Sequence, residues 1–326
     1  MKRFNKILCV VEPGTNSEAA LVQAERIAND HQAEITVASV LKGIAGLPKL
    51  LQNKSEINTS IKGLASVKRS AIENWVKECK PDLKAQIEVY TGIGFIEIIK
   101  SVVKNEYDLV IKCANDIDWL DRLFASDDVH LLRKCPCPVL MLKPGQKEVF
   151  RNVLATVDMN DDSNEMAGQR VQGQLNKKVL EYSAVFSVSE LTELHIGSVR
   201  NAYAEEFLLY STFSRLPEEK INRFSEQIRR DYSQKLELLI KEMNEFVGKD
   251  AVDYLHPKTH LVKGQPSKEI PLMAKEYAVD LIVMGTVART GIPGFIIGNT
   301  AESILEQVHC SVLAIKPDGF KTPVSI

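Results

Sequence analysis

Four glycines lie close together in the segment VMGTVARTGIPGFIIGNTAE at residues 283–302: Gly285, Gly291, Gly294 and Gly298. They follow a run of β-forming residues, and the closing letters GNTAE predict the start of a helix. Backbone N–H groups of such a turn can point into one concavity, where the helix end adds partial positive charge. The pattern is typical of a phosphate site. Because glycine motifs often occur without a ligand, a turn that only caps the helix is the alternative interpretation.

Polar residues within this segment could complete an anion site. Arg289 is the one cation between the first and last of these glycines. Gly298 would let a phosphate approach closely and could adopt a positive φ. Asn299 or Thr300 could cap the following helix, with Glu302 as a capping-box partner.

The chain contains two copies of one pattern. Four segments of the first half match four of the second half in the same order: 6–20 with 152–166, 33–40 with 192–199, 92–112 with 264–284, and 130–144 with 303–317. The duplication predicts two domains and a short tail, at residues 1–146, 147–320 and 321–326.

Each copy predicts alternating strands and helices. The strands are apolar runs without alternation, as expected when both faces of a sheet are covered. Helices are predicted at 17–30 and 56–79, and the apolar residues from Ile221 to Phe246 have helical spacing. This order indicates an α/β fold with a doubly wound parallel sheet, whose ligands bind at the carboxyl ends of the strands. Asp158, which follows the first strand of the second copy, and the glycine segment both belong to those ends, so Asp158 could bond a ribose hydroxyl or a base.

With these residues in place, the sequence resembles the universal stress protein family. The nucleotide loop of that family runs Gly, two residues, Gly, nine residues, Gly, then Ser or Thr. Here Gly285, Ala288 and Gly298 hold the three glycine positions, followed by Asn299 and Thr300. Ala288 departs from the pattern, and its methyl group restricts φ and crowds a ligand. Asn299 departs from Ser or Thr, although Thr300 follows at once.

The resemblance implies two tandem Rossmann-like domains, of the adenine nucleotide alpha hydrolase-like type, forming a pseudo-two-fold pair. It implies ATP or another adenine nucleotide as ligand, with Mg²⁺ only if the nucleotide is bound, and it places Ile196 against the base. It also implies stress survival in a bacterium, including resistance to DNA damage. The predicted nucleotide site comprises Asp158, Ile196, Gly285, Thr286, Ala288, Arg289, Gly291, Gly298, Asn299 and Thr300.

The corresponding segment of the first copy, at residues 112–130, contains no glycine. Where the second copy has GNT, the first has SDD, and Asp127 and Asp128 would satisfy the helix dipole themselves and repel phosphate. The first copy is therefore not predicted to bind a nucleotide. Four large apolar residues either plug the vacated cleft or line a pocket for an apolar ligand: Trp119, Leu120, Leu123 and Phe124.

Composition excludes several classes of protein. The 326 residues carry a net charge of −2 with no polybasic block, which argues against direct nucleic-acid binding. Apolar runs are too short to span a membrane. Six irregularly spaced cysteines suit a reducing cytoplasm, so a cytoplasmic protein is expected.

Other chemistry-bearing residues favour structural roles. Cys135 and Cys137 lack the spacing common in metal sites. His256 and His260 are four residues apart, but Pro257 disfavours the helix that would pair them. His195 lies within a predicted strand. No metal site is predicted. The sequence has no GxSxG and no GKS or GKT, so no catalytic residue is predicted either.

The leading hypothesis is a non-catalytic stress-response protein with an adenine nucleotide site in its second domain; slow ATP hydrolysis or self-phosphorylation stays open. The alternatives are a carrier or sensor of an apolar small molecule, and a scaffold with a vestigial ligand site. The last strand of each copy is predicted at a sheet edge, which invites pairing with another strand. We expect Val139–Leu142 and Val312–Ile315 to meet within one chain, giving a monomer or a weak homodimer.

Overall fold

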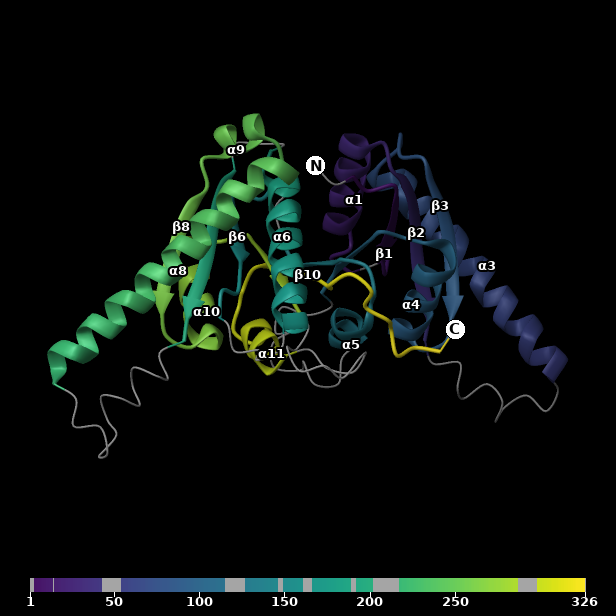
Figure 1. Cartoon of the computed structure of the whole chain (residues 1–326). Helices are drawn as coiled ribbons and strands as arrows, with labels where there is room; N and C mark the ends of the chain where they lie inside the picture. The colour runs from purple at the N-terminus through teal and green to yellow at the C-terminus, as the bar shows by residue number, and fades with distance from the viewer. Residues whose placement is uncertain are drawn as a thin grey trace. The chain divides into compact units, whose positions relative to one another are not determined.

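The computed structural model describes residues 3–13, 15–42, 54–114, 127–145, 149–160, 166–188, 192–201, 217–286 and 298–325. They form two compact units, one built on each repeat. Strands and helices alternate in both, which confirms the predicted α/β class (Figure 1).

The unit of the first repeat contains a mostly parallel sheet of order β3-β2-β1-β4-β5-β10, in which only β10 is antiparallel to its neighbour β5. Its elements are β1 (Lys6–Val10), α1 (Glu18–His31), β2 (Glu34–Leu41), α3 (Lys54–Cys79), β3 (Ala85–Thr91), α4 (Gly94–Asn105), β4 (Leu109–Cys113), α5 (Asp127–Lys134), β5 (Val139–Leu142) and β10 (Ser311–Ile315).

The unit of the second repeat contains parallel strands in the order β9-β6-β7-β8. Its elements are β6 (Asn152–Thr156), α6 (Met166–Val188), β7 (Glu193–Arg200), α8 (Glu218–Phe246), α9 (Lys249–Leu255), β8 (Lys258–Lys263), α10 (Pro266–Glu276), β9 (Leu281–Gly285) and α11 (Asn299–Leu305). The short helix α9 has no counterpart in the first repeat among the described residues.

Helices cover both faces of the second sheet. α6 contacts α8 and the strands β6, β7 and β9, while α10 contacts α11 and β7; Figure 1 shows α6 and α8 together along one side of these strands. The chain moves through α6 and α8 from β6 to β8 and then returns through α10 to β9, on the other side of β6. Because crossovers between parallel strands are right-handed, this reversal places α6 and α8 on one face of the sheet, and α10 and α11 on the other. Coverage on both faces explains why the central strands are buried along their length and why their sequences do not alternate.

The last strand of the chain belongs to the unit of the first repeat. β10 pairs with β5, with Leu313 opposite Leu140, and the backbone N–H of Lys143 donates to Ser311 Oγ at 3.1 Å. The side chains of β10 are almost fully buried. The sequence repeat and the compact units therefore differ at this point, because a strand encoded in the second copy completes the unit of the first.

Among the described helices, none is long and apolar enough to cross a lipid bilayer.

Candidate functional site

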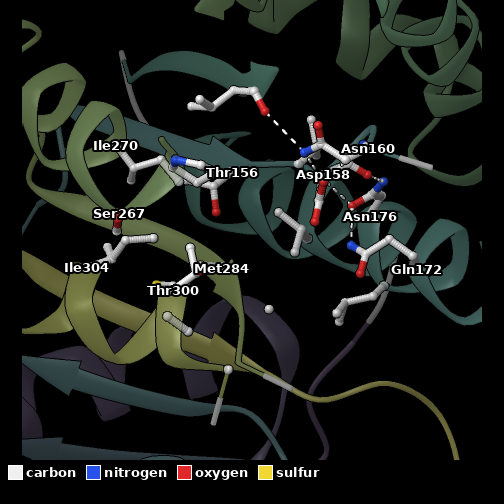
Figure 2. Close-up of a pocket in the computed structure, with 18 of the residues that line it drawn as sticks. Thr156, Asp158, Asn160, Gln172, Asn176, Ser267, Ile270, Met284, Thr300 and Ile304 are labelled. Carbon is white, nitrogen blue, oxygen red and sulfur yellow. Dashed lines mark hydrogen bonds between the residues drawn. The ribbon is translucent and has the colours of Figure 1, made fainter. Parts of the chain in front are cut away.

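A cavity of about 410 Å³ lies in the unit of the second repeat, where β6, β7 and β9 end. Figure 2 shows Asp158, Asn160 and Asn176 on one side of it, and Thr300, Ile304 and Met284 on the other. These strand ends meet at one edge of a parallel sheet, which is where open α/β sheets bind ligands. The structure thus brings Asp158 and the residues Gly298–Thr300 to the wall of one cavity, with Asp158 and Thr300 on opposite sides of it (Figure 2).

Asp158 is held by its neighbours before any ligand arrives. Its backbone N–H donates to Asn176 Oδ1 at 3.0 Å, and Asn176 Nδ2 donates to its carbonyl at 2.8 Å. Its carboxylate accepts from the backbone N–H of Asn160 at 3.0 Å and from Asn160 Nδ2 at 2.8 Å. A carboxylate fixed in this way loses little conformational entropy when it accepts a hydrogen bond from a ligand.

A network of amides supports this arrangement. Gln172 Nε2 donates to Asn176 Oδ1 at 3.1 Å, and Asn160 Nδ2 donates to the carbonyl of Val199 at 3.2 Å. Tyr232 on α8 donates to Asn160 Oδ1 at 2.7 Å. These residues were not predicted from the sequence. The one available signal was the spacing of Gln172 and Asn176, which places two amides on one face of α6.

The opposite wall differs from the predicted helix cap. α11 begins at Asn299, so Gly298 holds the cap position, and no side chain caps the helix. The prediction that Asn299 or Thr300 caps it is therefore wrong. Gly298 has φ −60° and ψ 138°, so the expected positive φ is also wrong. That conformation is open to any residue, and the glycine is needed here only if something must approach closely.

Gly285 lines the cavity but is required by packing. A Cβ at this position would lie 2.5 Å from Leu175 Cδ2 and 2.9 Å from Leu175 Cγ. Leu175 lies on α6 and is 4% exposed, so it has little room to move. The glycine therefore allows α6 to pack closely on the end of β9.

Gly285→Ala is expected to lower the free energy of unfolding of this unit by about 1–3 kcal/mol, because the added methyl group overpacks the contact with Leu175. Urea unfolding followed by circular dichroism measures the loss. In a double-mutant cycle with Leu175→Ala, the double variant should be less destabilised than the sum of the two single variants. Additive losses would show that the two side chains do not compete for this space.

Two predicted site residues lie away from the cavity. Ile196 is fully buried within β7 and does not line the cavity; Val199, nearer the end of the same strand, does. The difference arises because β7 continues to Arg200, so its end lies further along the chain than the resemblance indicated. Thr286 is fully buried directly after β9 and does not line the cavity. Ala288, Arg289 and Gly291 lie outside the described residues.

The acidic pair at the start of α5 is neutralised. Asp127 forms an ion pair with Lys42 at 2.6 Å, and Asp128 forms one with Lys112 at 2.8 Å. The match of SDD with GNT paired Asp128 with Thr300. The burial patterns of α5 and α11 instead align Asp128 with Ala301, one residue further along. The apolar group Trp119, Leu120, Leu123 and Phe124 lies outside the described residues.

The histidines form a contact that sequence reasoning missed. His195 Nδ1 lies 2.9 Å from His260 Nε2, and the ring of Tyr277 stacks on both. Burial lowers the pKa of both histidines below the ordinary value. His256 lies apart from this stack, at the end of α9. Within the part of the chain that the structure describes, no group of three His, Cys, Asp or Glu residues could hold a metal ion.

The two cysteines of CPCP lie side by side. Their sulfur atoms are 3.6 Å apart, and Cys135 is fully buried. The hydrogen bond from one thiol to the other raises the pKa of Cys137, and burial raises it further. A thiol held protonated in this way is a poor nucleophile, which fits a packing role.

Comparisons with known proteins agree with this architecture. The family model described as the universal stress protein family matches the chain twice, over residues 3–143 and 150–316. The chain is 28% identical over 322 residues to a universal stress protein E homolog of Haemophilus influenzae, covering 97% of this chain and 98% of the relative. It is 27% identical over 333 residues to universal stress protein E of Escherichia coli strain K12, covering 100% and 98%.

Solved structures share the fold. A protein of unknown function from Pseudomonas aeruginosa PAO1 superposes with a TM-score of 0.64 at 23% identity, over 97% of this chain and 94% of that one. A universal stress protein from Archaeoglobus fulgidus superposes with a TM-score of 0.60 at 17% identity, over 97% of each chain.

Proposed function

Because the chain belongs to the universal stress protein family, we propose that it acts in the stress response by binding an adenine nucleotide in the cavity of its second repeat. The proposal rests on the polar groups at two sides of the cavity. A preorganised carboxylate, Asp158, faces the first turn of α11 across a cavity of about 410 Å³. One wall suits the hydroxyls of a ribose or the edge of a base, and the other suits a phosphate.

We propose that two groups attract the phosphate. The first N–H groups of a helix have no intrahelical acceptor, and those of Asn299 and Thr300 lie at the cavity wall. Asp158 is the one charged side chain among the described residues that line the cavity. The positive charge that a phosphate needs nearby is therefore assigned to Arg289 of the glycine segment. A Mg²⁺ ion would enter only with the nucleotide. The same proposal holds the protein to be non-catalytic and cytoplasmic, with a role in surviving stress that includes DNA damage.

Native mass spectrometry of freshly purified protein tests the proposal directly. An adduct with the mass of an adenine nucleotide supports it, and isothermal titration of the unliganded chain with ATP should then give one site per chain. An apolar adduct of acyl type would favour a carrier, and the absence of both an adduct and ATP binding would favour a scaffold.

Gly298→Val is expected to weaken ATP binding roughly tenfold or more, because its branched side chain fills the space that the phosphate needs. Since Gly298 already has a φ and ψ that valine adopts readily, the variant should fold normally. Titration with ATP and a thermal melt measure the two effects. Unchanged affinity in a folded variant would contradict the assignment of the phosphate to this wall.

A further inference from the structure

A second cavity of about 410 Å³ lies in the unit of the first repeat, at the carboxyl ends of β1, β2 and β4. It occupies the position in its repeat that the candidate nucleotide cavity occupies in the other. Glu12 follows β1 at its wall, as Asp158 follows β6.

The backbone of Glu12 is braced in the same way as that of Asp158. The N–H of Glu12 donates to Ser17 Oγ at 3.0 Å, and the Ser17 hydroxyl contacts the Glu12 carbonyl at 3.3 Å. Asn176 makes the corresponding two contacts to Asp158. In both repeats, a side chain after the strand thus holds the backbone of the acidic residue; in the first repeat, the Thr15 hydroxyl also donates to the Glu12 carbonyl, at 2.7 Å.

The carboxylate of Glu12 is also positioned. Lys68 Nζ donates to its Oε1 at 2.7 Å and lies 3.4 Å from the carbonyl of Val40 at the end of β2. Asn160 Nδ2 joins Asp158 to the carbonyl of Val199 in the same manner. Ser39 Oγ donates to Glu12 Oε2 at 3.1 Å. Since a carboxylate offers about four lone-pair sites, these contacts leave room to accept a hydrogen bond from a ligand.

Among the described residues that line this cavity, the positive and negative charges are equal in number. Lys42, Lys68 and Lys112 each pair with a carboxylate, those of Asp127, Glu12 and Asp128 respectively. A phosphate placed against the start of α5 would meet Asp127 and Asp128, and each of these lysines already has a carboxylate partner. An anionic ligand is therefore disfavoured here.

Part of the wall formed by the described residues is apolar. The side chains of Val10, Val40, Ile98 and Leu131 line the cavity and are buried. They offer a surface for the flat, uncharged part of a ligand, while Glu12 offers an acceptor at the rim.

We propose that the cavity of the first repeat binds an uncharged ligand of the nucleoside class, with sugar hydroxyls that donate to Glu12 and a base that packs on the apolar wall. The inference rests on the proposed function, because the choice of a nucleoside follows from the shared architecture of the two cavities. The chain would then hold a phosphorylated ligand in one repeat and a phosphate-free one in the other.

Isothermal titration of the full chain with adenosine and with ATP tests this. We expect two adenosine sites and one ATP site per chain. Glu12→Gln should remove one adenosine site, or weaken it about tenfold or more, and leave ATP binding unchanged, because a neutral amide forms a weaker bond with a hydroxyl donor. The matched control is Glu88→Gln, since Glu88 pairs with Arg69 and does not line the cavity; it should change neither titration.

The two proposals can fail separately. If the wild-type chain binds one adenosine or none and Glu12→Gln changes nothing, the inference is overturned. Loss of an ATP site in Glu12→Gln would also overturn it, because the first cavity would then accept phosphate. If ATP fails to bind while Glu12→Gln still removes an adenosine site, the inference stands and the proposed function falls.

Discussion

Asp158→Ala is expected to lower the affinity of the full chain for ATP by roughly 10- to 150-fold, the range that corresponds to losing one hydrogen bond to a charged group. The carboxylate of Asp158 is oriented by Asn160 and is the one charged side chain among the described residues of the cavity wall. Its truncation removes a charged acceptor, and no other described side chain of the cavity wall carries a charge that could replace it. Isothermal titration with ATP measures the loss.

The fold should survive this substitution. The two bonds from Asn176 are made to the backbone of residue 158 and do not involve the carboxylate. Glu12→Ala is the matched control, because Glu12 holds the equivalent position beside the other cavity. It should leave ATP affinity unchanged. Equal losses in both variants, or no loss in Asp158→Ala, would place the nucleotide elsewhere.

The fold could be predicted because its signals are periodic and occur twice. The apolar runs and helical spacings predicted the order of elements, and the position of Asp158 after a strand predicted that it lies at the carboxyl edge of the sheet, where it lines a cavity. The repeat itself supplied a check, since each element predicted in one copy had a counterpart in the other.

The details of the site could not be predicted in the same way. Asn160 and Asn176 act through side-chain contacts that depend on how α6 packs on the loop after β6, and no local pattern specifies this. The repeat gave no help, because Ser17 and Lys68 make the corresponding contacts in the first copy with different chemistry. Polar networks of this kind are set by tertiary packing.

The helix start was misplaced for a related reason. Residue preferences favour Asn or Thr at a cap, yet α11 begins one residue earlier, with Gly298 in an ordinary extended conformation. Similarly, β10 belongs by sequence to the second copy, yet it pairs with β5 and is part of the first unit.

Asp128→Ala is expected to lower the free energy of unfolding of the first-repeat unit by about 3–5 kcal/mol, because it removes the carboxylate that lies 2.8 Å from the largely buried ammonium group of Lys112. The side chains of Asp128 and Lys112 are 7% and 12% exposed, so water cannot readily replace the lost partner. Lys112 Nζ would keep its bond to the carbonyl of Cys113 at 3.0 Å. That neutral acceptor compensates only part of the charge.

The second repeat supplies the matched control. Lys112 aligns with Met284 and Asp128 with Ala301, so the double variant Lys112→Met/Asp128→Ala installs the pair that the second repeat already carries. Removing both members of the ion pair leaves neither charge without the other, and the double variant should lie within about 1 kcal/mol of the wild-type chain. Both tryptophans of the chain, Trp75 and Trp119, fall in the first repeat, so urea unfolding followed by tryptophan fluorescence reports on this unit. If the double variant lost as much stability as Asp128→Ala alone, the loss of free energy would come from the lost packing of Asp128 and not from the charge of Lys112.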